Sequence, residues 1–182
     1  MNKTLVLENT ALGAEVAGAI ERIRARVALH SGNHVELQQA VVELQRLALS
    51  PLWATPEIRA AAPGEELLYE VAVTRGAPSL YLVSDGVGVV SSAHTHQTWA
   101  VIAGIRGQEL NLLFGVISTA EKSVGPPSES VIVGVGQTLS LGKECIHATE
   151  VLGSEATFHL HLYGQPLCEL PSFESRRYFT RS

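Results

Sequence analysis

Three histidines stand where they could bind one metal ion together. His94 and His96 are separated by one residue, so on a strand both side chains would point to the same face, about 6.6–7 Å apart along the chain. Imidazole nitrogens bind metal ions at about 2.0–2.1 Å, so one ion can reach both rings. Gly136 precedes His147 at a spacing that suits a second hairpin carrying a third ligand. Three neutral imidazoles would leave the ion its full charge and open coordination positions.

Two other interpretations of these residues stay open. In the first, the His-x-His pair lies on a solvent-facing strand and binds no metal. Cys145 stands two residues before His147, and if both faced inward the set would be three histidines and a cysteine. Such a set is typical of a tetrahedral zinc site that is closed and structural. Against this, Cys145 lies in the turn-like segment 142–146, and a free cysteine is often only a small buried hydrophobe.

A second group of polar residues alternates with leucines near the end of the sequence. On a strand, His159, His161 and Tyr163 would share one face and the two leucines between them the other. Polar side chains inside a barrel are costly unless they bind one another or a ligand. Beside a metal they could orient a substrate or carry a proton. The alternatives are a solvent-facing strand or a core tyrosine, and His159 with His161 also forms a second candidate metal-binding pair.

Composition limits the class of protein. The chain has 182 residues, of which 46% are hydrophobic, enough for one compact domain with a core. A net charge of −5 gives no basic surface for nucleic acid, and no apolar run is long enough to span a bilayer. The N-terminus lacks a signal-like apolar stretch, and two cysteines do not form a disulfide scaffold. These features predict a cytoplasmic protein.

The hydrophobic pattern changes near residue 65. Before it, apolar residues recur at helical spacing, and Pro51 ends the second helix. These residues are Val16, Ile20, Ile23 and Val27, then Leu37, Val41, Leu44 and Ala48. Beyond it come short runs rich in β-branched and aromatic residues, which predict an all-β barrel or sandwich of jelly-roll type. The runs are 67–74, 79–84, 87–93, 98–105, 109–119, 130–133, 138–141, 148–152 and 157–163. The segment 125–128 predicts the loop between the two halves of the barrel.

Taken together, these motifs resemble the cysteine dioxygenase and 3-mercaptopropionate dioxygenase family of cupins. Most cupins carry a glutamate a few residues after His-x-His, whereas Ala100 and Val101 stand there in this chain. The segment 94–109 is similar to bacterial members, and 159–164 is similar to their Ser-x-His-x-Tyr triad. The resemblance implies one cupin double-stranded β-helix domain over 1–182, with a helical segment at 1–64, the barrel at 65–166 and a C-terminal extension at 167–182.

The same resemblance implies a mononuclear non-haem iron(II) dioxygenase. Iron(II) would be held by the three histidines named above, with zinc, nickel or copper as alternative metals in the isolated protein. A small thiol and dioxygen would be the substrates, and both oxygen atoms would end on sulfur as a sulfinate. His161 and Tyr163 would correspond to the triad's histidine and tyrosine, which direct substrate and oxygen by hydrogen bonds. An exposed edge strand of a jelly roll is a common dimer surface, so a homodimer is one open assembly.

Three positions depart from the family pattern. His159 replaces the triad serine, and Cys145 stands where a small residue is common. The family also holds the substrate carboxylate with an arginine or glutamine shortly after an upstream tyrosine, but no such residue follows Tyr69. Arg75 and Arg106 lie nearby in the sequence, which places neither of them in the pocket. The resemblance therefore carries over the iron site but not the family's amino-thiol carboxylate substrate, and the substrate expected is a small thiol, with or without the carboxylate. The alternatives are a three-histidine oxygenase acting on a diketone or similar compound, and a non-enzymatic metal-binding cupin.

Overall fold

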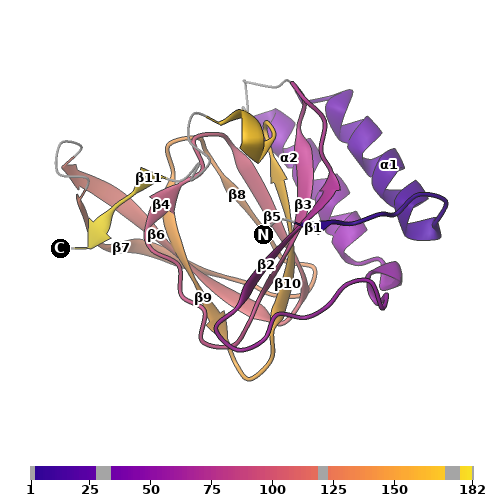
Figure 1. Cartoon of the computed structure of the whole chain (residues 1–182). Coiled ribbons are helices and arrows are strands. Elements are labelled where there is room, and N and C mark those ends of the chain that lie inside the picture. The colour runs from indigo at the N-terminus through magenta and orange to yellow at the C-terminus, as the bar shows by residue number, and fades with distance from the viewer. Residues whose placement is uncertain (1–2, 28–33, 119–122, 171–176, 182) are drawn as a thin grey trace.

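The computed structural model describes residues 3–27, 34–118, 123–170 and 177–181, which form two helices and two β-sheets (Figure 1). The helices are α1 (Ala11–Arg24) and α2 (His34–Ala48), followed by two short 3-10 turns, η1 (Pro51–Trp53) and η2 (Leu167–Glu169). The strands are β1 (Lys3–Thr4), β2 (Glu66–Ala72), β3 (Ser79–Asp85), β4 (His94–Thr95), β5 (Ala100–Arg106), β6 (Gln108–Ser118), β7 (Ser123–Val133), β8 (Thr138–Leu141), β9 (Ile146–Leu152), β10 (Thr157–Tyr163), β11 (Arg177–Tyr178) and β12 (Thr180–Arg181).

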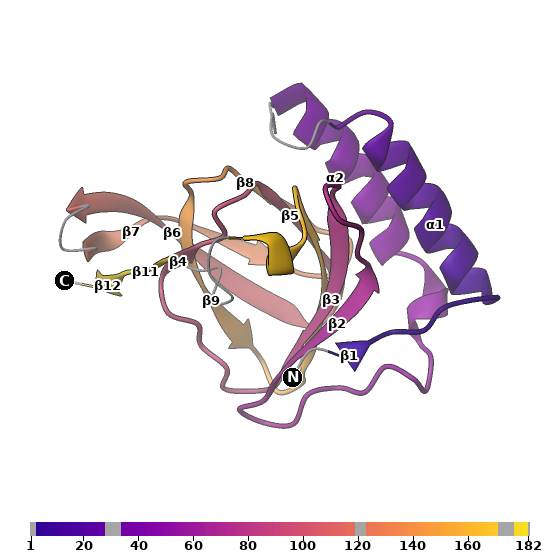
Figure 2. The same ribbon diagram turned by 45° about the horizontal axis from the view of Figure 1, so that its top comes forward.

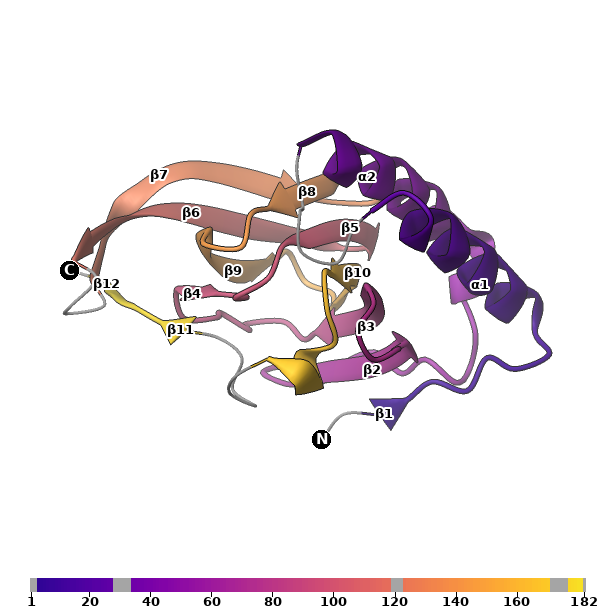
Figure 3. The same ribbon diagram turned by 90° about the horizontal axis from the view of Figure 1, so that it is seen from above.

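The two sheets face each other around a common interior (Figures 1 and 3). Sheet A has the strand order β1-β2-β3-β10-β5-β8, and sheet B has the order β11-β4-β9-β6-β7-β12. Strands distant in sequence are neighbours in both sheets, as in a jelly roll. The prediction of a mainly β jelly roll preceded by helices is therefore confirmed.

Helices α1 and α2 cover the outer face of sheet A (Figure 2). The Thr10 hydroxyl caps α1 by accepting a hydrogen bond of 2.9 Å from the Gly13 amide. The apolar stripes expected from the sequence are largely buried against the sheet, although Val27 lies beyond the end of α1 and Val41 is only partly buried. No helix in the described part of the chain is long and apolar enough to cross a membrane.

Strand β10 lies in the middle of sheet A and separates two environments. It pairs with β3 on one side and with β5 on the other. Leu160 and Leu162 point outward and join the apolar cluster under the helices. Tyr163 points to the inner face and joins a second cluster inside the barrel. The two-residue alternation expected for this strand is thus realised, and all seven of its residues are buried.

Two expected segments differ from the structure. Residues 87–93 form a turn and a single bridge from Val90 to Glu150 rather than a strand, because Gly88 adopts a positive φ of 83° and reverses the chain. Residues 125–128 are not a loop between barrel halves but lie within β7. Pro127 is accommodated there because the β6–β7 register shifts beside it, so its missing N–H interrupts no regular ladder.

The C-terminal residues return to sheet B. Strand β11 pairs with the short strand β4, and β12 pairs in parallel with β7. The Phe179 amide donates a 2.8 Å hydrogen bond to the Ala93 carbonyl, one residue before β4. The end of the chain therefore supports the strand that carries the first histidine. The division of the sequence into one domain with three segments stays a prediction.

We expect Gly104→Ala to lower the free energy of unfolding by about 1–3 kcal/mol, as overpacking typically does. A methyl group at Gly104 would collide with the backbone carbonyl of Gly134, in a turn held to Gly104 by two backbone hydrogen bonds of 2.9 and 3.0 Å. Gly115→Ala on β6 is the matched control, because nothing lies within 4 Å of the added carbon. Urea denaturation of both variants checks this, and equal stabilities would contradict it.

Candidate metal centre

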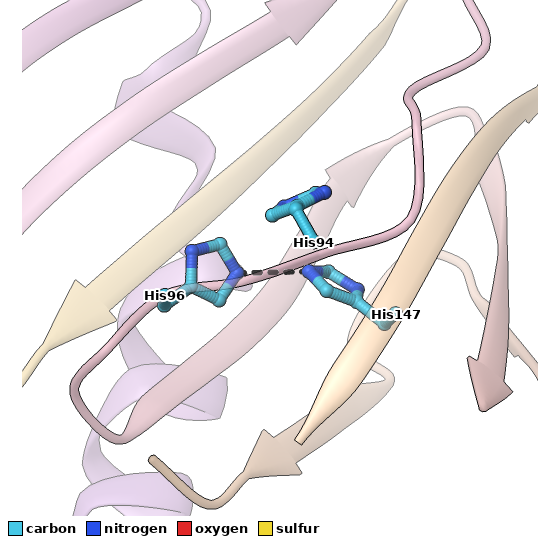
Figure 4. Close-up of side chains that lie close together, drawn as sticks. All are labelled: His94, His96 and His147. Atoms are coloured by element: carbon cyan, nitrogen blue, oxygen red, sulfur yellow. Dashed lines mark hydrogen bonds between the residues drawn. The ribbon is translucent and has the colours of Figure 1, made fainter. Parts of the chain in front are cut away.

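The structure brings His94, His96 and His147 into one buried cluster. One ligand-capable nitrogen from each ring lies within 4.8 Å of the others, and each residue is at most 4% exposed. The closest pair is His96 Nε2 and His147 Nε2 at 2.8 Å (Figure 4). The His94 ring lies 5.0 Å from that of His96 and 4.6 Å from that of His147, measured between centroids. The expected metal-binding set is therefore assembled in space.

Backbone pairing accounts for this convergence. His94 on β4 is directly opposite His147 on β9, so their side chains leave the sheet on the same face. His96 lies just beyond β4, and the next residue, Gln97, adopts a left-handed φ of 57°. A non-glycine residue in that region is uncommon, and here the chain turns sharply after the second histidine. The His-x-His pair thus shares one face although its strand is only two residues long.

Two of the rings are held in a defined tautomer by hydrogen bonds on their far side. His94 Nδ1–H donates to the Ser92 carbonyl at 2.7 Å. His147 Nδ1–H donates to Asn111 Oδ1 at 2.9 Å. A neutral imidazole that donates through Nδ1 has its lone pair on Nε2, which is the nitrogen a metal binds. These contacts therefore orient both rings as ligands.

The structure bears on the closed zinc site considered from the sequence. Such a site would need Cys145 as its fourth ligand. Cys145 is not part of the ligand cluster but packs with the apolar residues inside the barrel. The cluster in the described part of the chain therefore consists of the three histidines without the cysteine.

Sequence reasoning missed the two residues behind His147. Asn111 is fully buried on β6, and its amide Nδ2–H donates a 3.0 Å hydrogen bond to Glu109 Oε1. Both side chains are on the inner face of β6, since residues two apart on a strand point the same way. That i, i+2 spacing of polar residues in an apolar strand was the available signal, the same one that indicated the polar row on β10.

His161 and Tyr163 lie beside the histidine cluster. The Tyr163 hydroxyl and His161 Nδ1 share a hydrogen bond of 3.1 Å. The Tyr163 ring lies 5.0 Å from the His96 ring, centroid to centroid. A phenol and an imidazole are thus in contact with each other and next to a candidate ligand. This arrangement can donate or accept a proton where a molecule approaches the metal position.

His159 occupies a different environment from these two. It is fully buried, and its Nε2–H donates to the Val133 carbonyl at 3.1 Å. Its Nδ1 has no hydrogen-bond partner among the described residues. Burial is the main cause that lowers the pKa of His159 below its usual value. His159 therefore lies outside the three-histidine cluster, and a catalytic role for it stays a prediction.

The residues considered for binding a substrate carboxylate face away from the interior. The Tyr69 hydroxyl contacts the backbone of Arg59, and the ring packs in the cluster under the helices. Arg75 is almost fully exposed, and the Arg106 guanidinium stacks on Phe158 on the outer face of sheet A. No lysine or arginine is buried among the side chains that the structure describes.

Tyr81 on β3, the strand next to that of Tyr69, does face the barrel interior. It pairs with His161 across the β3–β10 ladder, and its ring lies 5.7 Å from that of Tyr163. Its hydroxyl accepts a 3.0 Å hydrogen bond from the Leu167 amide. Burial, together with the nearby Cys168, Glu70 and Glu169, raises the pKa of Tyr81 to about 12. Tyr81 therefore keeps its proton at neutral pH.

Comparison with known proteins gives similarity of fold only. No family model matches the chain, and no curated protein matches it. Among solved structures it is similar to a cupin-like protein from Thermotoga maritima (11% identity, 67% of this chain and 86% of that one, TM-score 0.49). It is also similar to a cupin superfamily protein from Desulfitobacterium hafniense (15%, 64% and 92%, TM-score 0.48) and to the DMSP lyase DddQ from Ruegeria pomeroyi (16%, 58% and 48%, TM-score 0.43). At these values the similarity carries no information on chemistry.

Removal of one ligand should abolish stoichiometric metal binding. We expect His147→Ala to weaken cobalt(II) binding by more than the about 10–100-fold that changes outside the first shell cost. His159→Gln is the control and should retain one ion per chain, because His159 lies outside the cluster. Titration with cobalt(II) followed by absorbance checks this. Loss of the ion in His159→Gln but not in His147→Ala would indicate the alternative pair on β10.

The lowered pKa of His159 predicts a pH dependence of stability. As the pH falls below the ordinary histidine pKa of about 6.5, the unfolded chain binds a proton that buried His159 does not. Above that pH, protonation of His159 contributes nothing to the free energy of unfolding. Below it, the contribution lowers the free energy of unfolding progressively, until the pH reaches the pKa of His159 in the folded state. Metal-free His159→Gln should therefore lose stability less steeply on acidification, by up to about 1.4 kcal/mol per pH unit. Equal slopes in urea denaturation between about pH 7.5 and 5.5 would contradict this.

Proposed function

We propose that this protein is an iron(II)-dependent dioxygenase that oxidises a small thiol to its sulfinate. The reaction balances as one thiol and one dioxygen giving one sulfinic acid, with both oxygen atoms transferred to sulfur and no external reductant. The observation that carries the proposal is the buried cluster of three neutral histidine ligands with the hydrogen-bonded His161–Tyr163 pair beside it. The sequence resemblance to thiol dioxygenases supports the same conclusion.

The three histidines are suited to iron(II). Imidazole is a common ligand of iron, and no carboxylate belongs to the cluster. His94 and His147 are fixed with Nε2 as the donor atom, so the site is organised before an ion binds. When bound, iron(II) supplies the redox chemistry that lets dioxygen react with a thiolate. The protein contributes neutral ligands, which leave the ion positively charged and attractive to that thiolate.

His161 and Tyr163 would position the reactants. The Tyr163 hydroxyl is within hydrogen-bond distance of His161 Nδ1, and its ring lies against His96. A hydroxyl in that position can donate to oxygen or sulfur while the imidazole behind it holds its orientation. Both side chains are nearly fully buried, so this hydrogen bond is protected from competition with bulk water.

The interior favours a thiol without a carboxylate. A carboxylate bound in an apolar interior is costly unless a cation lies beside it. The inner apolar cluster instead presents mostly aliphatic and aromatic groups near Tyr163. Its members are Tyr81, Ala100, Ile102, Val133, Leu141 and Tyr163, with Leu68, Leu113, Val131, Leu139, Cys145 and Leu167 packed against them.

Oxygen uptake by the iron(II)-loaded protein tests the proposal. With a panel of cysteamine, cysteine and 3-mercaptopropionate, we expect one dioxygen consumed per sulfinate formed, and the highest kcat/KM for the thiol without a carboxylate. Tyr163→Phe should lower kcat about tenfold, equivalent to one hydrogen bond of about 1.4 kcal/mol. Tyr69→Phe is the matched control, since that hydroxyl forms hydrogen bonds with the Arg59 backbone on the helical side.

Two outcomes would contradict the proposal. Uptake driven by a diketone but by no thiol would assign the site to a different three-histidine oxygenase. Tightly bound zinc, with no uptake after exchange for iron, would assign the protein to the metal-binding cupins without oxygenase activity.

A further inference from the structure

A buried carboxylate lies two hydrogen bonds behind one of the candidate metal-binding histidines. Glu109 on β6 is 1% exposed, and Asn111 on the same strand is fully buried. Glu109 Oε1 accepts from Asn111 Nδ2–H at 3.0 Å, and Asn111 Oδ1 accepts from His147 Nδ1–H at 2.9 Å. The three residues therefore form a continuous hydrogen-bonded chain that ends at His147 Nδ1, on the side of the ring opposite the metal-facing Nε2.

The carboxylate decides which way the asparagine amide faces. An ionised carboxylate only accepts hydrogen bonds, so the NH₂ group of Asn111 must face Glu109. The amide oxygen must then face His147, and this oxygen also only accepts. His147 Nδ1 consequently carries the proton, and Nε2 carries the lone pair. With the amide turned over, its NH₂ group would face Nδ1, and the favoured tautomer would place the proton on Nε2, where it blocks a metal ion.

The negative charge of Glu109 also favours metal binding. Three neutral histidines do not reduce the charge of a divalent ion, and a buried carboxylate is costly unless positive charge lies near it. An ion held by His147 and its neighbours would place positive charge two hydrogen bonds away from Glu109.

We infer that Glu109 is a positioning residue for the metal centre, acting through Asn111. It holds His147 in the tautomer that offers Nε2, and its negative charge offsets part of the ion's charge without occupying a coordination position. This inference rests on the metal-binding part of the proposed function and is independent of which substrate is oxidised.

Cobalt(II) affinity and the cobalt absorption spectrum of the full-length protein test this role. We expect Glu109→Gln to weaken binding about 10–100-fold, the usual effect of an outer partner of a ligand, because the glutamine amide can donate to Asn111 and turn it over. Glu150→Gln is the matched control: it removes the same charge from an exposed position on β9, the strand of His147, and should bind as the wild type does.

A pair of double variants separates this role from a merely structural one. In an Asn111→Ala background, Glu109→Gln should have little further effect, because its route to His147 is already lost. In Glu109→Gln with Asn111→Asp, the carboxylate moves next to His147, and the amide at position 109 can donate to it. This swap keeps the net charge and should restore most of the cobalt affinity and the wild-type spectrum, which a general packing defect would not allow.

The outcomes distinguish the inference from the site on which it rests. Unchanged affinity in Glu109→Gln, additive effects in the Asn111→Ala background, or a swap variant that folds but binds no better than Glu109→Gln would each overturn the role of Glu109. A wild-type protein that binds no cobalt would overturn the metal centre itself. Circular dichroism of the metal-free variants shows whether each is folded, and the swap tests the role even if a single variant is not.

Discussion

The register between β4 and β9 is the constraint on which the site depends. His94 and His147 are partners in that ladder, so their imidazoles leave the sheet side by side before any metal binds. A shift of one residue would turn one of them to the outer face, because side chains alternate along a strand. β4 is only two residues long, and β11 pairs along its other edge, which gives this short strand hydrogen bonds on both sides.

The helices bury the outer face of sheet A, and polar side chains can therefore be accommodated inside the barrel. Sheet A has an apolar outer face, and α1 and α2 bury it together with Leu160 and Leu162 of β10. Because this packing forms the largest apolar cluster, the inner face of the same strand can carry two histidines and a tyrosine. Each inner polar group then needs a partner, as Tyr163 provides for His161 and the Val133 carbonyl for His159. The outer face of β10 thus packs in the apolar core, and its inner face carries the residues proposed to take part in chemistry.

The features that the sequence predicted depend on periodicity within one helix or strand. The features that it did not predict depend on which strands pair with each other. Alternation placed the polar row of β10 correctly, and helical spacing identified both helices, because each signal lies within one element. The role of Asn111 depends on which strand lies beside β9, and no local pattern contains that information. The proline segment at 125–128 indicated a loop, yet the register shift in β7 accommodates it. Strand pairing also decides that Tyr69 lies on the helical face, whereas Tyr81 on the neighbouring strand faces the interior.

A carboxylate affects a metal site differently when it binds the ion and when it lies behind a ligand. A carboxylate that binds the metal occupies a coordination position and lowers the positive charge felt by an incoming anion. Placed behind Asn111, Glu109 stabilises the loaded site while every position not taken by a histidine remains available. Its field still reaches the ion, but through two hydrogen bonds and at a greater distance, so the attraction for a thiolate is reduced less. A site built in this way can bind its metal firmly and still accept two small ligands side by side.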